Sequence, residues 1–143
     1  ETVPPVVPIV IGQLDDSHIQ QIASQIKSII TPQTRLIISS DFIHYGDSFG
    51  FTPFTENIEN SIKEMDMGAI QYIEKRDVEG FKNYINEYNP TICGRDAIQI
   101  GMRLLSEDSS GACRHYQMSA EENQDWSHSV SYASIVFNGE WQE

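Results

Sequence analysis

Two short apolar runs separated by an amphipathic stretch constrain the fold of this chain most strongly. Residues 6–11 (VVPIVI) and 34–39 (TRLIIS) have the mostly apolar composition of strands that are buried on both faces of a sheet. Between them, isoleucines recur at helical spacing over residues 17–30, and Ser17 followed by Gln20 resembles a capping box. This order predicts a right-handed parallel β-α-β unit, and therefore an α/β fold whose central sheet is flanked by helices.

The rest of the sequence predicts three more helices and two more strands. Helical periodicity covers Thr55 to Lys75, Asp77 to Tyr88 and Ile92 to Leu105. Alternating side chains predict strands from Ala112 to Met118 and from Ser129 to Phe137. Since no internal repeat or linker interrupts the pattern, we expect residues 1–143 to belong to one α/β domain.

Composition and charge exclude some partners. The chain has 143 residues, of which 39% are hydrophobic, and this is enough for a packed core. Its net charge of −12 comes without any cluster of Lys or Arg. Because phosphate groups are bound by positive surfaces, we expect neither nucleic acid nor an anionic membrane to be a partner.

The sequence also predicts a soluble, cytoplasmic protein. No apolar run approaches the roughly 20 residues of a membrane span, and no signal segment opens the chain. The two cysteines therefore indicate free thiols more than a disulfide. Because the chain opens on Glu1 and reaches an apolar run almost at once, we expect further sequence to precede it in the natural protein.

Asp41 and His44 are the first candidate site residues. They follow the predicted strand at 34–39 within an aromatic and polar loop, and ligands usually bind at the carboxyl ends of parallel strands. A carboxylate can orient an imidazole or stabilise its cation, so the pair is suited to holding and moving protons. The alternative is that Asp41 caps a turn and His44 packs in the interior.

Cys93 is the second candidate. It stands between the break at Asn89-Pro90 and the start of a predicted helix, where backbone N–H groups, the helix dipole and Arg95 favour a thiolate. A thiolate there would serve as a metal ligand or a redox group. The alternative is a small buried residue at a tight helix entry, whereas Cys113 has the pattern of a structural position in a strand.

Three ordered motifs resemble those of the Memo family. They are Ser39-Ser40-Asp41-Phe42-x-His44, Thr91-Ile92-Cys93-Gly94-Arg95 and Ser129-Val130-Ser131-Tyr132-Ala133. The resemblance covers nearly the whole chain but only the C-terminal half of a Memo protein. It implies that residues 1–143 are half of a larger α/β domain. The N-terminal half, where the family carries a Pro-His-Ala-Gly-like loop and a second histidine-bearing loop, would then complete the pocket.

The resemblance also implies a metal site. Memo proteins are related to class III extradiol dioxygenases, in which two histidines and a carboxylate hold a non-haem iron and another histidine acts as acid or base. By position, His44 is similar to that acid or base, with Asp41 beside it, and Cys93 falls where the carboxylate ligand would be. A thiolate favours softer ions, so we expect copper rather than iron or zinc, and ordinary dioxygenase ring cleavage is not expected.

Two functions follow for such a protein. The first is a copper-binding redox protein, a candidate oxidoreductase, linked to cell motility signalling as the family is. The second is a non-enzymatic adaptor whose pocket binds a phosphotyrosine peptide, with Arg95 or Arg114 contacting the acidic group. In both, the expected partner within the same protein is its N-terminal half.

Overall fold

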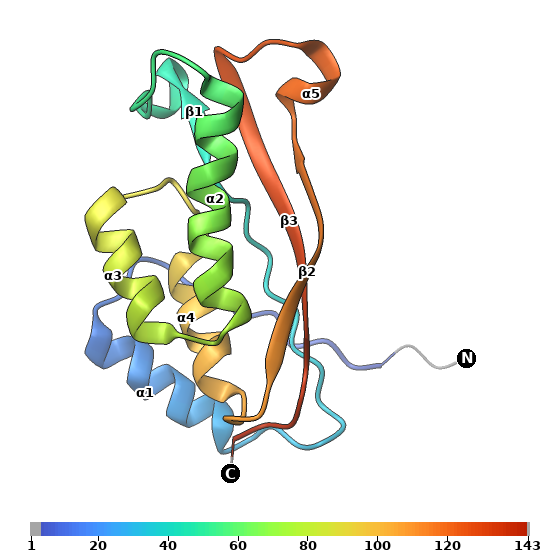
Figure 1. The fold of residues 1–143 in the computed structure, drawn as a ribbon. Helices are drawn as coiled ribbons and strands as arrows, with labels where there is room; N and C mark the ends of the chain where they lie inside the picture. The colour runs from blue at the N-terminus through green and yellow to red at the C-terminus, as the bar shows by residue number, and fades with distance from the viewer. Residues whose placement is uncertain (1–3, 143) are drawn as a thin grey trace.

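A computed structural model describes residues 4–142 and has a mixed α/β architecture (Figure 1). The four longest helices gather on one side of a three-stranded antiparallel sheet of order β1-β3-β2, as Figure 1 shows. The α/β class predicted from the sequence is therefore confirmed, but the sheet is antiparallel. The elements in chain order are α1 (Asp16–Lys27), β1 (His44–Gly46), the 3-10 helix η1 (Asp47–Phe49), α2 (Ile58–Glu74), α3 (Val78–Tyr88), α4 (Arg95–Leu104), β2 (Ser110–Met118), α5 (Ala120–Asn123) and β3 (His128–Asn138).

The two C-terminal strands form the long hairpin that the alternation predicted. β2 and β3 pair from Ser110 opposite Asn138 to Met118 opposite Ser131, with a register shift between Cys113 and His115. β1 adds only a short antiparallel pairing at the other edge of β3, from His44 opposite Val130 to Gly46 opposite His128. β3 is therefore the central strand, and beyond Ser131 the β1-side edge of β3 has no strand beside it among the described residues.

Helix α2 packs on this hairpin, and α3 packs against α2 and α4, through the apolar faces that periodicity predicts. On α2, Ile62, Ala69, Ile70 and Ile73 are buried. They lie in clusters with buried residues of the other elements, among them Phe81, Ile92 and Met102. The predicted starts of α2 and α4 were early by about one turn, whereas α3 begins after Asp77, whose carboxylate accepts a hydrogen bond from the N–H of Gly80 at 2.8 Å.

Helix α1 lies where it was expected but is capped differently. Its N-cap is Asp15, whose side chain accepts hydrogen bonds from the His18 N–H at 2.9 Å and the Ser17 hydroxyl at 2.7 Å. Ser17 is thus inside the helix, and the predicted capping box with Gln20 was wrong. A carboxylate at the N-terminus also interacts favourably with the helix dipole, which explains why Asp15 takes this position.

The predicted parallel β-α-β start is absent from this structure. Residues 6–11 and 34–39, which are all described, have no regular secondary structure. Most of their apolar side chains are exposed, with Val10 97% and Ile37 90% accessible, whereas Ile11 is half-buried. A strand needs a hydrogen-bonding neighbour, and residues 4–142 provide none for either segment. The prediction of two buried strands was therefore wrong for the chain by itself.

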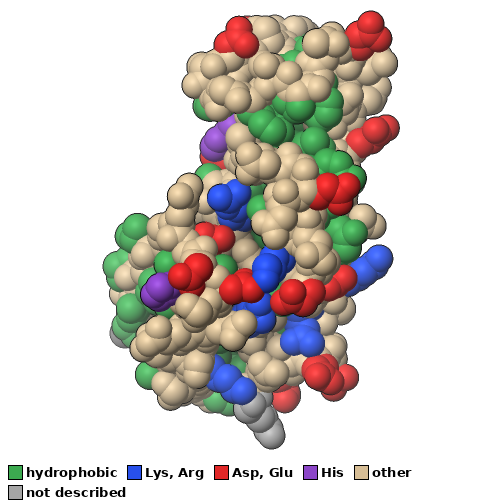
Figure 2. Space-filling model, turned by 90° about the vertical axis from the view of Figure 1, so that its left-hand side faces the viewer, with side chains coloured by type: hydrophobic (Ala, Val, Ile, Leu, Met, Phe, Trp, Pro, Cys, Tyr) green, Lys and Arg blue, Asp and Glu red, His purple; other side chains and the backbone are tan. Residues whose placement is uncertain are grey.

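The charged surface is mixed. Figure 2 shows Lys and Arg side chains interspersed with Asp and Glu on the face that it presents. Ion pairs join Lys82 to Asp16, and Arg103 to Glu79 at 3.5 Å. Among the described residues, no helix combines the length and apolarity that crossing a membrane requires.

Candidate metal site

The backbone directly before β1 fixes one side of the candidate site. The N–H of Phe42 donates to the carbonyl of Ser131, and the N–H of Ser131 donates to the carbonyl of Ile43, each at 2.9 Å. Phe42 and Ile43 are buried, at 3% and 0% accessibility. The polar residues on either side of them, Asp41 and His44, are consequently held at the surface of a rigid segment.

The loop before α4 fixes the other side. The N–H of Asp41 donates to Sγ of Cys93 at 3.2 Å, and the N–H of Gly94 donates to Oγ of Ser40 at 2.9 Å. A Cβ on Gly94 would lie 2.5 Å from the Cβ of Ser40, so the two loops approach this closely only because residue 94 is glycine. Cys93 stands directly before this residue, which is the N-cap of α4.

These loops bring together the three residues singled out in the sequence. One ligand atom each from Asp41, His44 and Cys93 lie within 4.8 Å of one another. Nε2 of His44 is 3.5 Å from Oδ2 of Asp41, an ion-pair distance when the imidazole is protonated. The His44 side chain is 23% accessible and that of Asp41 is 47% accessible, so the pair lines an open surface and not a closed core.

The chemistry of this group suits a metal ion. A sulfur, an imidazole nitrogen and a carboxylate oxygen are the three common types of protein ligand for transition metals. Within the described part of the chain the group has three side chains, whereas a structural site normally has four ligands and a catalytic site three plus an open position. The arrangement can therefore serve as one wall of a metal pocket or as a small catalytic site.

An aromatic cluster borders the group. The ring of Phe49 lies 5.1 Å from that of His44 and 4.7 Å from that of His128, centroid to centroid. Nδ1 of His128 is 3.1 Å from the hydroxyl of Ser48. His128 is exposed at the start of β3. Its closeness to the ring beside His44 was missed, because only the pairing of β1 with β3 brings them together.

Asp66 is a buried acid behind the site that the sequence analysis did not single out. It is 0% accessible, accepts a hydrogen bond from Tyr116 Oη at 2.7 Å, and accepts a longer one from the N–H of Ile43 at 3.3 Å. Burial raises the pKa of the Asp66 carboxyl to about 6, although its hydrogen bonds oppose this. The available signal was a charged residue inside an apolar helical stripe, between Ile62 and Ile70.

Cys113 lies apart from the candidate group. Both cysteines have free thiols, as expected. Cys113 is half-buried in β2, and burial together with the nearby Glu74 carboxylate raises the pKa of its thiol. The N–H of Cys113 donates to the Glu74 side chain at 2.6 Å. This residue therefore has the structural setting that the sequence predicted.

The fold and site define a mixed α/β chain that carries a group of sulfur, nitrogen and oxygen ligands between two loops. This chain belongs to the Memo family, because the family described as Memo-like protein matches residues 4–136. It is 32% identical over 139 residues to Protein MEMO1 of Xenopus laevis and 30% identical over 139 residues to Protein MEMO1 of Homo sapiens. A MEMO1 family protein of Pyrococcus furiosus is 37% identical over 108 residues, which cover 71% of this chain and 36% of that protein.

The length of these relatives bears on the site. The matches to the two MEMO1 proteins cover 90% of this chain but 47% of each relative. The chain thus spans about half the length of the curated relatives that it matches.

Proposed function

We propose that this chain provides one wall of a metal pocket, with Cys93 as the ligand and the Asp41–His44 pair beside it. The observation that carries the proposal is the convergence of three ligand atoms within 4.8 Å from two loops that are far apart in sequence. Cys93 is exposed, so its sulfur is accessible to an ion. His44 and Asp41 lie close enough to each other to hold a proton at Nε2 next to the bound ion.

Copper is the ion that we propose. A thiolate ligand favours a soft ion, and Cu(I) is softer than the zinc or iron alternatives. When bound, copper would supply one-electron redox chemistry, which is the basis for proposing a redox role. From the family resemblance we further propose a link between this role and cell motility signalling. Ring cleavage by a non-haem iron is the less favoured alternative, because a thiolate is not part of the usual two-histidine, one-carboxylate set.

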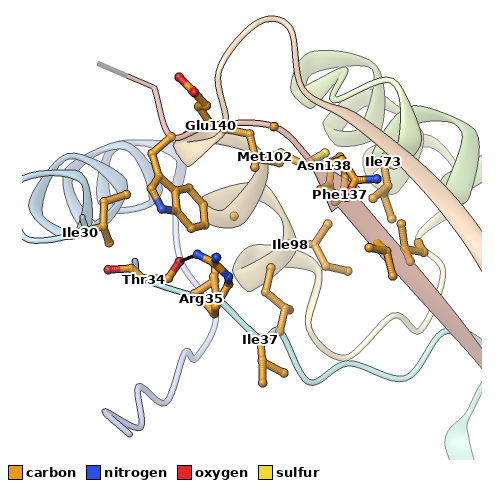
Figure 3. Close-up of a pocket in the computed structure, with 18 of the residues that line it drawn as sticks. Ile30, Thr34, Arg35, Ile37, Ile73, Ile98, Met102, Phe137, Asn138 and Glu140 are labelled. Carbon is orange, nitrogen blue, oxygen red and sulfur yellow. Dashed lines mark hydrogen bonds between the residues drawn. The ribbon is translucent and has the colours of Figure 1, made fainter. Parts of the chain in front are cut away.

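We propose that the remaining ligands come from the other half of a Memo-length protein, and that this half docks on an apolar groove. The groove, of about 1120 Å³, lies between residues 30–38, α4 and the end of β3. Figure 3 shows Ile37, Ile98 and Phe137 among the side chains around it. Its opening is bordered by an exposed apolar segment on one side and by the edge of β3 that lacks a neighbouring strand on the other.

Three features support this occupant over others. Relatives are about twice as long as the chain, so proteins of this family contain a further segment of similar length that could fill the groove. The exposed apolar side chains at 6–10 and 36–38 belong to segments whose composition fits buried strands. An unpaired strand edge beside an apolar groove is the geometry to which a further strand adds. Docking there would place new residues next to Ser40, which lines the groove and adjoins Asp41.

A second candidate function is binding of a phosphotyrosine peptide. The observation in its favour is Arg95, which begins α4 close to Cys93 and whose guanidinium contacts Asn89 at 3.5 Å. A bidentate contact from Arg95 to a phosphate would be consistent with an adaptor role. Arg114, the other arginine considered, is an exposed residue of β2.

Metal loading of the complete protein tests the primary proposal. The protein and its Cys93→Ser and Arg95→Gln variants are loaded with Cu(I) under reducing conditions and dialysed against a competing chelator. We expect near-stoichiometric copper in the wild type and in Arg95→Gln, and loss of copper in Cys93→Ser. Retention of copper by Cys93→Ser would show that Cys93 is not the ligand. Absence of copper from the wild type, with phosphotyrosine peptide binding lost in Arg95→Gln, would favour the adaptor.

A further inference from the structure

One threonine hydroxyl forms hydrogen bonds with both the backbone N–H and the backbone carbonyl of His44. The N–H of His44 donates to Oγ1 of Thr91 at 2.7 Å, and the same hydroxyl donates to the carbonyl of His44 at 2.9 Å. Thr91 belongs to the loop that carries Cys93, and its side chain makes both bonds across a sequence separation of 47 residues. The hydroxyl thereby uses its donor and an acceptor position on one residue of the facing segment.

The sheet explains why His44 needs this partner. His44 stands opposite Val130 in the antiparallel pair, and the N–H of Ser131 bonds to the carbonyl of the preceding residue, Ile43. Because hydrogen-bonded and non-hydrogen-bonded positions alternate in antiparallel pairs, the peptide groups of His44 face away from β3. They lie at the outer edge of the sheet, where unpaired backbone groups cost free energy once water is excluded. Thr91 takes the place of a neighbouring strand at this one residue.

The same bonds connect the two loops of the candidate site. From Thr91 the chain runs through Ile92, which is 3% accessible, to Cys93. At the other end of the contact, Ser40 bonds to the N–H of Gly94 and the N–H of Asp41 bonds to Cys93. Hydrogen bonds therefore join the two loops on both sides of the Cys93 thiol. At the His44 end, these bonds are made by the Thr91 hydroxyl.

We propose that Thr91 is a positioning residue that sets the placement of His44 relative to Cys93. It acts through backbone contacts and does not touch the metal. The inference deepens the proposed function, because it concerns the same pocket. Its physical basis is that the Thr91 hydroxyl holds the loop of the proposed ligand Cys93 against the His44 segment. Groups that position a metal ligand commonly change metal affinity about 10-fold to 100-fold when they are replaced.

The variant Thr91→Val tests this role in the complete protein. Valine has nearly the same shape as threonine but leaves the N–H and carbonyl of His44 without the hydroxyl. We expect Cu(I) affinity, measured by competition with a chelator, to fall about 10-fold to 100-fold. Thr91→Ser keeps the hydroxyl and should restore affinity. Ser28→Ala removes a side-chain bond to the carbonyl of Gln25 at the end of α1, away from both loops, and should leave affinity unchanged.

Two readouts in the metal-free protein keep this inference separate from the copper proposal. In Thr91→Val the amide hydrogen of His44 should exchange at least 10-fold faster, since its bond is gone, and Cys93 should be alkylated faster. Neither should change in Ser28→Ala. If wild-type protein binds no copper but these two rates change, the copper proposal fails and the positioning role stands. If His44 amide exchange and Cys93 alkylation in Thr91→Val were as slow as in the wild type, the positioning role of Thr91 would be overturned, whether or not the protein binds copper.

Discussion

At the scale of single residues, the candidate site depends on how differently two cysteines are placed. Cys93 is exposed directly before the N-cap of α4 and accepts a hydrogen bond from a backbone N–H. Cys113 is half-buried, and burial and Glu74 raise the pKa of its thiol. Since the thiolate is the reactive form, accessibility and surroundings both favour reaction at Cys93.

We therefore predict that Cys93 is alkylated faster than Cys113 in the folded protein at neutral pH. Peptide mass mapping after short exposures to a thiol reagent measures both rates in one sample. The rates should converge in denaturant, where the two thiols have similar surroundings. Faster labelling of Cys113 in the folded state would contradict the assignment of Cys93 as the accessible thiol.

Asp66 gives a prediction about pH. Burial raises the pKa of Asp66 to about 6 in the folded protein, whereas an aspartate in an unfolded chain has a pKa of about 3.9. The folded state thus binds this proton more tightly, so the contribution of Asp66 to stability is greatest below about pH 4 and is lost as the pH rises through about 6. The shift corresponds to roughly 2 to 3 kcal/mol.

Asp66→Asn measures this contribution. Asparagine is neutral at every pH and retains an acceptor for the N–H of Ile43, so the difference between the variant and the wild type isolates the carboxyl. Denaturant unfolding between pH 4 and pH 8 should show the wild type losing stability relative to the variant as the pH rises. Parallel pH profiles would show that the Asp66 carboxyl titrates at an ordinary pKa.

At the scale of elements, Gly94 decides how α4 meets the β1 loop. A Cβ there would lie 2.5 Å from the Cβ and 2.6 Å from the Oγ of Ser40. Ser40 has too short a side chain to move aside, so the loop itself would have to shift. We predict that Gly94→Ala destabilises the protein by about 1 to 3 kcal/mol, the usual range for overpacking.

The matched control is Gly12→Ala, because a Cβ on Gly12 meets nothing within 4 Å. Thermal unfolding of the two variants should show a large decrease in melting temperature for Gly94→Ala only. The Gly94 variant should also alkylate Cys93 at an altered rate. Equal melting temperatures for both variants would mean that the two loops can separate without cost.

The elements also show what sequence patterns could and could not establish. The β2–β3 hairpin and the buried face of α2 were predictable because alternation and helical period are local properties of the chain. The segments at 6–11 and 34–39 have strand-like composition, but a strand forms only beside a partner, and composition does not supply one. The Asp15 cap was missed because Ser17 offered an equally good local pattern.

The site was predictable in part for a similar reason. Asp41, His44 and Cys93 could be found from residue type and loop position together with the family resemblance. The contacts of Thr91 and Asp66 could not, because each joins segments that only the fold brings together.

At the scale of the whole molecule, exposed apolar segments border a groove beside an open strand edge. We predict that Ile37→Asp leaves the isolated chain as stable as before, since Ile37 is 90% accessible. The same change in the complete protein should destabilise it, because a charge would be buried where we propose that the other half docks. Chemical denaturation of both forms measures this. A substitution without effect in the complete protein would show that the groove stays open to solvent.

The central claim is that the metal pocket is divided between this chain and the other half of a Memo-length protein. The most direct test compares the 143-residue chain with the complete protein, both loaded with Cu(I) under reducing conditions and dialysed against a competing chelator. One thiolate with a neighbouring imidazole and carboxylate gives too few soft ligands for tight binding. We predict near-stoichiometric copper in the complete protein and little in the short chain. Near-stoichiometric retention by the short chain would contradict the claim and would mean that it holds a complete site by itself.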